Sequence, residues 1–365
     1  MKWVVETTIF KSLTFFMLAV ALSACDRTPP EAKWVAALMT QIGGDYLELM
    51  AASKSMADSV DSYCANPNDL AQPRAEWRQT MAAWQHVQWV RFGPVVDNND
   101  DWKIQFWPDK KNIVARKVNQ LLARQEPVDT AAVASASVVV QGLSALELLM
   151  FDPQYSQQFS TDNPVADKHC QLLVATSKHL VSTISNIYQQ WEQPKFQARW
   201  LGSIVDPEST MHVDAETEAV GAMLSQMEKV KLDKLGGPLG YKNRNRQPNG
   251  YFAEGWRSHT SLANIKTNLL SIKVLIDNQG EYDLRRLLAA KGNDELADKI
   301  QTQINMCLSL VSAIDIPLSL AVMDVAHKQQ LEALHQAVGE LNSLLKSGLS
   351  SALDIKLGFN SNDGD

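Results

Sequence analysis

The chain has 365 residues, of which 45% are hydrophobic and 21% are charged. This is the composition of a folded globular protein and excludes an intrinsically disordered chain. Acidic residues outnumber basic ones by 41 to 34, and no basic block occurs, which excludes nucleic acid as the expected partner. Only the N-terminus contains an apolar run near membrane-span length, so a polytopic membrane protein is also excluded.

Residues 1–24 are typical of a bacterial lipoprotein signal peptide. Lys2 and Lys11 supply positive charge before a short apolar run. The run ends in Leu22-Ser23-Ala24-Cys25, which resembles a lipoprotein cleavage box. An ordinary secretory signal with a chance cysteine is the alternative interpretation.

Cleavage before Cys25 would leave this residue as the acylated N-terminus, inserted in a lipid bilayer through several chains. Residues 25–33 would then form a proline-containing tether. We therefore expect a lipid-anchored protein that faces the bacterial periplasm. Asp26 resembles the signal that retains some lipoproteins at the inner membrane, with the outer membrane as the alternative.

The other three cysteines are Cys64, Cys170 and Cys307. An oxidising compartment permits disulfides, and an odd number allows at most one bridge among them. Cys307 lies in an apolar run, where a buried thiol is expected. A bridge between Cys64 and Cys170 is therefore favoured, and the cysteine spacings do not suit zinc.

Helical periodicity dominates the chain from residue 34 onwards. Apolar residues recur at helical spacing from Val35 to Tyr63, until Asn66-Pro67-Asn68 interrupts them. Further helices are expected over 71–92, 129–151, 164–192, 213–234, 253–277, 281–291, 294–314 and 321–350, with loops over 93–112 and 235–252. Sustained strand alternation is missing from the sequence. The prediction is an all-α protein with two antiparallel helical bundles, over 34–192 and 193–365.

The most apolar helix of the first half carries a polar pair. Ser144 and Glu147 are three residues apart and so share one helix face, and Gly142 permits close approach of another backbone. A buried carboxylate needs a partner, so Glu147 should contact a cation, a hydrogen-bond donor or a metal. A purely structural acid is the alternative.

A second polar stripe is expected in the second half. Glu254, Arg257, Ser258 and Ser261 fall at helical spacings of three, four and seven residues within the predicted helix 253–277. A solvated helix face is the simpler explanation, but apolar residues follow immediately. Two inward-facing polar patches, one in each bundle, would suit a ligand site at the bundle interface.

The first long loop adds two charged candidates. Arg91 precedes Phe92-Gly93-Pro94, and Asp109 ends Phe106-Trp107-Pro108-Asp109. Arg91 could bind a carboxylate or phosphate with two parallel hydrogen bonds. It could equally be a structural partner of Glu147 or Asp109.

Taken together in their order, several motifs resemble the imelysin-like periplasmic lipoproteins. In addition to the segments above, they are Gly142-Leu143-Ser144-Ala145-Leu146-Glu147, Lys234-Leu235-Gly236-Gly237-Pro238-Leu239-Gly240, Glu254-x-Trp256-Arg257-Ser258 and the closing Gly358-Phe359-Asn360-Ser361-Asn362-Asp363-Gly364-Asp365. The resemblance covers nearly all of the mature chain. It implies two helical bundles around a cleft, in a family that includes a membrane protease and iron-regulated proteins.

The family signature is Gly-x-His-x-x-Glu, whose histidine and glutamate are the proposed metal ligands. Gly142 and Glu147 match it, but Ser144 occupies the histidine position, and serine is a poor ligand for zinc or ferrous iron. The resemblance therefore leaves Glu147 as the one candidate ligand for an iron or other divalent metal ion. It also leans against enzymatic activity.

From the resemblance we expect a non-catalytic periplasmic binding lipoprotein linked to iron or other metal acquisition. It would bind a metal or a small anionic ligand and work with periplasmic partners of an uptake system. The expected cleft residues are Arg91, Asp109, Ser144, Glu147, Glu254, Arg257 and Ser258. An imelysin-type metallopeptidase is one alternative, and a structural or interaction lipoprotein is another; a peptidase would need about three metal ligands.

Overall fold

The computed structural model describes residues 28–67, 69–157, 164–194, 196–198, 200, 211–280 and 282–356. Every regular element in these ranges is a helix, which confirms the predicted all-α class. Within them, no helix combines the length and the apolar character needed to cross a membrane. The predicted signal peptide and the acylation site Cys25 lie outside the described residues.

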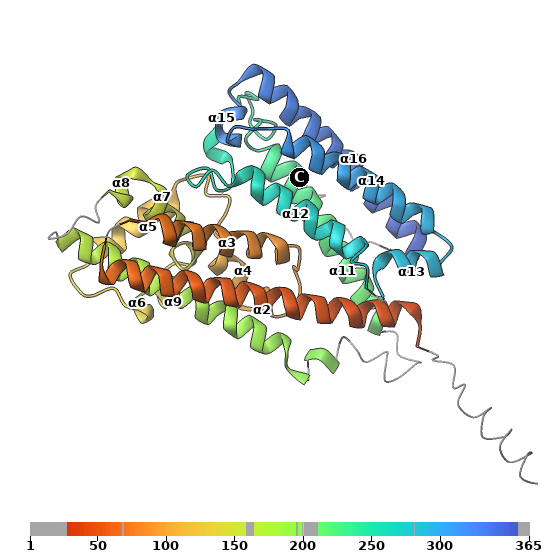
Figure 1. Ribbon diagram of the computed structural model, residues 1–365, viewed down its shortest axis with the longest axis horizontal. Helices are drawn as coiled ribbons and strands as arrows, with labels where there is room; N and C mark the ends of the chain where they lie inside the picture. Colours follow the sequence, from red (N-terminus) through yellow and green to blue (C-terminus); the bar gives the residue numbers. More distant parts are fainter. Residues whose placement is uncertain are drawn as a thin grey trace, which may run out of the picture.

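Three long helices form the framework of the first half: α2 (Pro30–Ala65), α3 (Ala71–Val87) and α9 (Pro164–Trp191). Helix α2 packs along both α3 and α9 (Figure 1). It begins at Pro30, inside the segment expected to be a tether, because proline suits the first helical turn. It ends just before Asn66, as the sequence predicted.

The region between α3 and α9 is more broken than the sequence suggested. Its elements are η1 (Gly93–Val95), η2 (Asp97–Asn99), α4 (Asp100–Ile104), α5 (Ile113–Leu122), α6 (Thr130–Ala134), η3 (Val138–Val140), α7 (Leu143–Phe151) and α8 (Pro153–Ser156). The single helix expected over 129–151 is wrong. Three β-branched valines form a short 3₁₀ turn, and Gly142 then adopts a non-helical backbone with φ −153° and ψ −146°.

The second half is also helical and packs against the first. Its elements are α11 (Met211–Glu228), the π-helical η4 (Lys229–Leu235), η5 (Gly250–Phe252), α12 (Ser261–Ile276), α13 (Leu284–Ala290), α14 (Asp294–Ser312), α15 (Leu318–Ala321) and α16 (Val325–Leu353). Helix α12 contacts α14 on one side and α3 on the other (Figure 1). It therefore connects the packing of the two halves.

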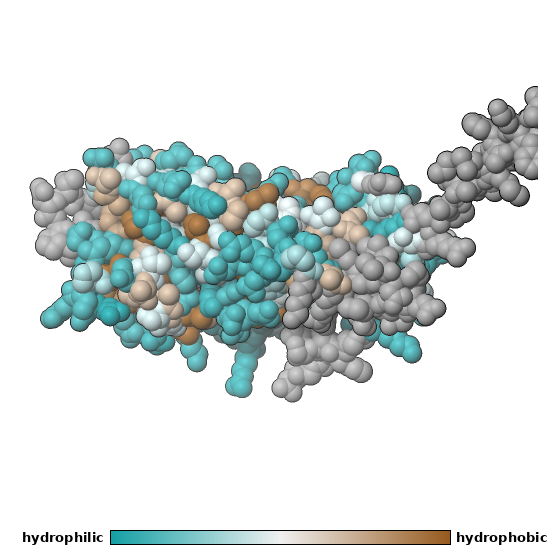
Figure 2. All heavy atoms as spheres, turned by 90° about the horizontal axis from the view of Figure 1, so that it is seen from below, coloured by the Kyte–Doolittle hydropathy of each residue, from teal (hydrophilic) through white to brown (hydrophobic). Residues whose placement is uncertain are grey.

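The apolar core is continuous from one half to the other. Trp77 of α3 and Trp191 of α9 belong to the same buried cluster as Leu269 of α12 and Leu341 of α16. The division into bundles over 34–192 and 193–365 stays a prediction. Figure 2 shows one outer face, on which hydrophilic side chains cover most of the surface and apolar ones form small patches.

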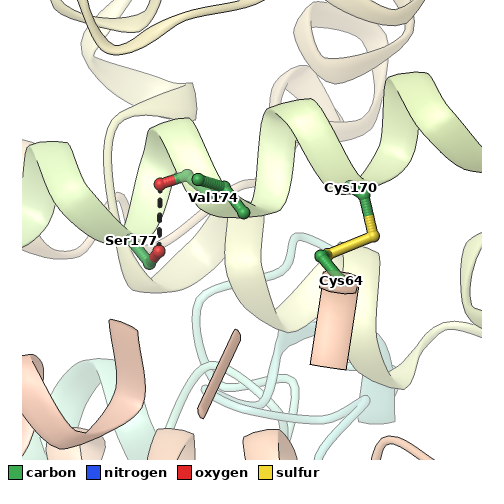
Figure 3. The surroundings of a disulfide bond; sticks show 4 residues. All are labelled: Cys64, Cys170, Val174 and Ser177. Carbon is green, nitrogen blue, oxygen red and sulfur yellow. Dashed lines mark hydrogen bonds between the residues drawn. A yellow bond between two sulfur atoms is a disulfide. The ribbon is translucent and has the colours of Figure 1, made fainter. Parts of the chain in front are cut away.

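A disulfide joins the end of α2 to α9. Cys64 and Cys170 are bonded with a Cα–Cα distance of 5.6 Å, as the sequence analysis favoured (Figure 3). Cys307 is free and buried on α14. Burial, with a smaller contribution from Glu340, raises the pKa of its thiol to about 12, so the thiolate needed for reactivity does not form at neutral pH.

Glu216 of α11 is a buried acid that predicts a pH dependence of stability. Its side chain is 3% exposed, and its Oε1 has no hydrogen-bond partner. Burial and the nearby Glu31 raise its pKa to about 7, against a partial opposing effect of Lys291. Between pH 4.5 and about 7, Glu216 therefore keeps its proton in the folded chain but has lost it in the unfolded chain.

The free energy of unfolding should thus fall as the pH rises from about 4.5 to about 7. Glu216→Gln should remove this slope and add roughly 1–3 kcal/mol of stability at pH 8. Urea denaturation of both proteins between pH 4.5 and 8 measures the effect. Equal slopes in the two proteins would contradict the assignment to Glu216.

Candidate functional site

A pocket of about 650 Å³ opens where α7 meets the segment that precedes α12. Its walls are aromatic and charged. The aromatic lining residues are Phe106, Trp107, Tyr251, Phe252 and Trp256; the carboxylates are Asp109, Glu147, Asp152 and Asp233; and the cations are Lys110, Lys242 and Arg257. Both halves of the chain contribute, so we call this space the ligand pocket.

Glu147 is the most buried carboxylate that lines the pocket. Its Oε1 accepts hydrogen bonds from the backbone N–H of Ser258 at 2.9 Å and from the Ser258 hydroxyl at 2.8 Å. Burial raises the pKa of Glu147, although these two bonds and nearby Arg257 oppose the rise. Its second oxygen, Oε2, accepts no hydrogen bond from the described residues.

Two small residues set the position of α7. Ser144 lines the pocket and donates its hydroxyl to the carbonyl oxygen of Phe106 at 2.9 Å. Gly142, just before α7, lies directly against the backbone carbonyls of Lys103 and Ile104, where a Cβ atom would overlap both oxygens. The close approach allowed by glycine therefore holds the first turn of α7 against α4.

Gly142→Ala should lower the free energy of unfolding by about 1–3 kcal/mol, because backbone carbonyls cannot move aside as flexible side chains can. Gly44→Ala is the matched control, since an added Cβ there meets no atom within 4 Å in the exposed middle of α2. That substitution should be neutral or stabilise slightly. Chemical denaturation measures both, and an unaffected Gly142→Ala protein would contradict the packing described.

The segment from Glu254 to Thr260 is irregular, and the predicted helix over 253–277 is wrong at its start. Gly255 and His259 have φ values of +63° and +59°, which a right-handed helix cannot contain. The two polar patches nevertheless meet, because Ser258 bonds Glu147 across 111 residues of sequence. Ser261 instead donates to the carbonyl oxygen of Glu254.

Glu254 does not line the pocket but forms a buried ion pair behind it. Its Oε2 lies 2.9 Å from Nζ of Lys234, and each side chain is 1% exposed. Lys234 also donates to Gln85, Gln88 and Asn268 at 2.5, 2.9 and 2.7 Å. Burial would raise the pKa of Glu254, but Lys234 brings it below its ordinary value. Through these contacts Lys234 connects α3, η4 and α12. The ion pair was not predicted from the sequence.

Two more of the predicted cleft residues have other positions or roles. Arg91 is exposed and does not line the pocket, so its predicted place in the cleft is wrong. Asp109 lines the pocket, but its two oxygens accept the backbone N–H groups of Ile113 and Val114 at 2.7 and 2.9 Å. Asp109 therefore satisfies the otherwise unpaired donors at the start of α5.

Arg257 lines the pocket and is held on two sides. Its Nε lies 3.0 Å from Oδ2 of Asp152, and its guanidinium stacks 4.3 Å above the ring of Trp256. Trp256 itself contacts Tyr251 edge-on, with ring centroids 4.8 Å apart. One wall of the pocket is thus a fixed array of two aromatic rings and a cation.

The residues around Glu147 do not fit a bare metal ion. Among the described residues, no group of three or more His, Cys, Asp or Glu side chains is arranged to hold one. Asp152 and Asp233 are paired with Arg257 and Lys242. Glu147 alone supplies too few ligands for an iron or zinc site.

A family model described as imelysin, peptidase M75, matches residues 44–345. The chain belongs to the imelysin family. Among curated proteins, it is 22% identical over 230 residues to iron-regulated protein A of Synechococcus elongatus, which aligns over 61% of this chain. The match spans only 57% of that relative's length.

Two solved structures share the imelysin fold of this chain. An imelysin-like protein from Psychrobacter arcticum aligns with a TM-score of 0.76 and 21% identity over 90% of this chain and 97% of its own. A putative iron-regulated protein A precursor from Parabacteroides distasonis aligns with a TM-score of 0.68 and 19% identity, over 89% and 96% of the two chains. These likenesses confirm an all-helical, imelysin-like fold, which the sequence motifs implied.

Proposed function

We propose that this imelysin-family chain is a non-catalytic binding lipoprotein that holds a chelated metal, in the first place chelated iron, in the ligand pocket. The link to iron is supported by the names of two similar proteins, each described as iron-regulated protein A. The ligand is a chelate because no group of three or more His, Cys, Asp or Glu side chains in the described ranges is arranged to hold a bare metal ion. The chelator therefore brings the donor atoms that the protein lacks.

The hydrogen bonding of the Glu147 carboxyl group is the observation that carries this proposal. Its Oε1 is fixed by Ser258, whereas Oε2 accepts no hydrogen bond from the described chain and borders a pocket with aromatic walls. When ionised, the Glu147 carboxylate can accept a hydrogen bond from a hydroxyl group of a polar chelator. When protonated, it can donate one to a carboxylate of the chelator. The flat faces of Trp107 and Trp256 can pack against its carbon skeleton.

The N-terminal sequence supports a lipid anchor close to the start of the folded helices. Acylation at Cys25 would fix the chain to the bilayer, and α2 begins only five residues later, at Pro30. With Asp26 next to the anchor, we place the protein at the periplasmic face of the inner membrane. Partners from a metal-uptake system would then reach the pocket from the periplasm.

Glu147→Gln should weaken the binding of ferric citrate by about tenfold or more, because an amide cannot replace a charged or acidic hydrogen-bond partner. The fold should survive, since the glutamine carbonyl can still accept both bonds from Ser258. Calorimetric titration of the full acylated chain in detergent measures the affinity. Glu295→Gln, an exposed acid on α14, is the matched control and should bind as the wild type does.

The same titration distinguishes the alternatives. If neither ferric citrate nor ferrous, zinc or copper ions bind, the metal-related proposal is wrong. Chelator-sensitive peptide cleavage that disappears in Glu147→Gln would instead establish an imelysin-type metallopeptidase. If the wild type binds free zinc or ferrous ion tightly but not ferric citrate, the chelate is the wrong ligand class.

A further inference from the structure

A second hollow, of about 390 Å³, lies beside the ligand pocket against helix α5. We call it the α5 hollow. It shares three lining residues with the ligand pocket: Asn112, Asp152 and Arg257. These residues border both spaces: Arg257 and Asp152 form an ion pair, and Oδ1 of Asn112 lies 3.5 Å from Nη2 of Arg257.

The two spaces differ in charge. Among the described residues that line the ligand pocket, four carboxylates face three cations. The α5 hollow has three cations, Lys111, Arg116 and Arg257, and only the carboxylate of Asp152. An excess of positive charge is unusual for a chain whose net charge is −7, and it favours an anion in the hollow.

The three cations that line the α5 hollow have N–H donors that are not used by the described parts of the chain. Lys111 and Arg116 are exposed, and their side chains form neither an ion pair nor a hydrogen bond with the described parts of the chain. Arg257 has five N–H donors, of which Nε is used by Asp152 and Nη2 makes only the long contact with Asn112. Its side chain is 14% exposed and is fixed over Trp256, so little freedom is lost when an anion binds.

Asp152 is also held in place beside Arg257. Its Oδ1 accepts the backbone N–H of Gln154 at 3.1 Å at the start of α8, while Oδ2 binds Arg257. An incoming carboxylate therefore does not need to displace Asp152. It can bind the remaining donors of Arg257 from the side of the hollow, in the parallel geometry that guanidinium groups favour.

We infer that the α5 hollow is an anion subsite that binds a carboxylate arm of the same ligand whose body lies in the ligand pocket. This inference rests on the proposed function for the nature of that ligand, but not for the subsite itself. Recognition would then be divided between two spaces. Glu147 and the aromatic walls contact the body of a polycarboxylate chelate, and Lys111, Arg116 and Arg257 neutralise its free carboxylate.

The test compares Lys111→Gln/Arg116→Gln with the wild type in calorimetric titrations of the full acylated chain. The probes are citrate alone and ferric citrate, each at low and at high salt. The double variant should bind both probes roughly tenfold more weakly at low salt and should lose most of the salt dependence. Lys117→Gln is the matched control, because Lys117 lies on the same helix but outside the hollow, and it should bind like the wild type.

The outcomes separate the subsite from the proposed function. Ferric citrate binding that the double variant leaves unchanged would overturn the subsite and leave the proposed function standing. Citrate binding that the double variant weakens, with no binding of ferric citrate, would support the subsite and overturn the iron chelate. If neither probe binds the wild type, both are overturned.

Discussion

Lys234→Met should lower the free energy of unfolding by about 3–5 kcal/mol, which is a large share of the stability of a typical domain. The substitution leaves Glu254 buried without the cation 2.9 Å away that stabilises its charge. It also removes the donor to Gln85, Gln88 and Asn268, whose acceptors are buried in the same contact. Urea denaturation at pH 7 measures the loss.

Two further variants test the cause of that loss. Glu254→Gln in the Lys234→Met background removes the unpaired charge, so it should restore part of the stability. Lys242→Met breaks the more exposed pair with Asp233 and should cost no more than about 1 kcal/mol. If Lys234→Met costs no more than Lys242→Met, the buried pair does not connect the two halves as described.

Removing the disulfide should also destabilise the fold strongly. The bond joins Cys64 to Cys170, which are 106 residues apart, and a closed loop of this length restricts the unfolded chain considerably. Cys64→Ala/Cys170→Ala should lower the free energy of unfolding by about 2–5 kcal/mol. Denaturation without reductant measures the difference from the wild type.

Reduction provides the control for this prediction. A reductant should lower the stability of the wild type towards that of the double variant and leave the double variant unchanged. Cys307 is buried and should not contribute to the effect. Equal stability of the oxidised wild type and the double variant would show that the bond does not constrain the chain.

The long amphipathic helices could be predicted from the sequence because their periodicity and their stop signals agree. Helix α2 ends before Asn66-Pro67, and α9 begins at Pro164 and ends within one residue of the prediction. The prediction of a single helix over 129–151 was wrong for a physical reason. An unbroken apolar run shows burial but not period, so it concealed the turn before Gly142.

The site was predictable in part. Ser144 and Glu147 line the pocket, and Ser258 of the second polar patch donates to Glu147, because buried polar groups need hydrogen-bond partners. Arg91 was placed wrongly because the helix expected over 71–92 ends at Val87, and Arg91 follows it on the surface. Spacing along the chain does not fix the direction of a side chain that lies beyond the helix end.

The Lys234 contact could not be found by local pattern at all. Its partners Gln85 and Gln88 are 149 and 146 residues away in the sequence. A signal was available in two buried glutamines three residues apart, Gln85 near the end of α3 and Gln88 just after it, which indicate a polar partner somewhere in the fold. Only the tertiary arrangement identifies that partner as Lys234, the first residue of the motif over 234–240.

Chelated iron in the ligand pocket is the central claim, and the contents of the native protein test it most directly. The measurement is the metal and organic-acid content, by mass spectrometry, of the full-length protein purified from cells that produce it naturally, beside its Glu147→Gln variant. We expect iron together with a comparable amount of a polycarboxylate chelator in the wild type, with both depleted in the variant. Iron bound without any chelator, or equal contents in the two proteins, would contradict it.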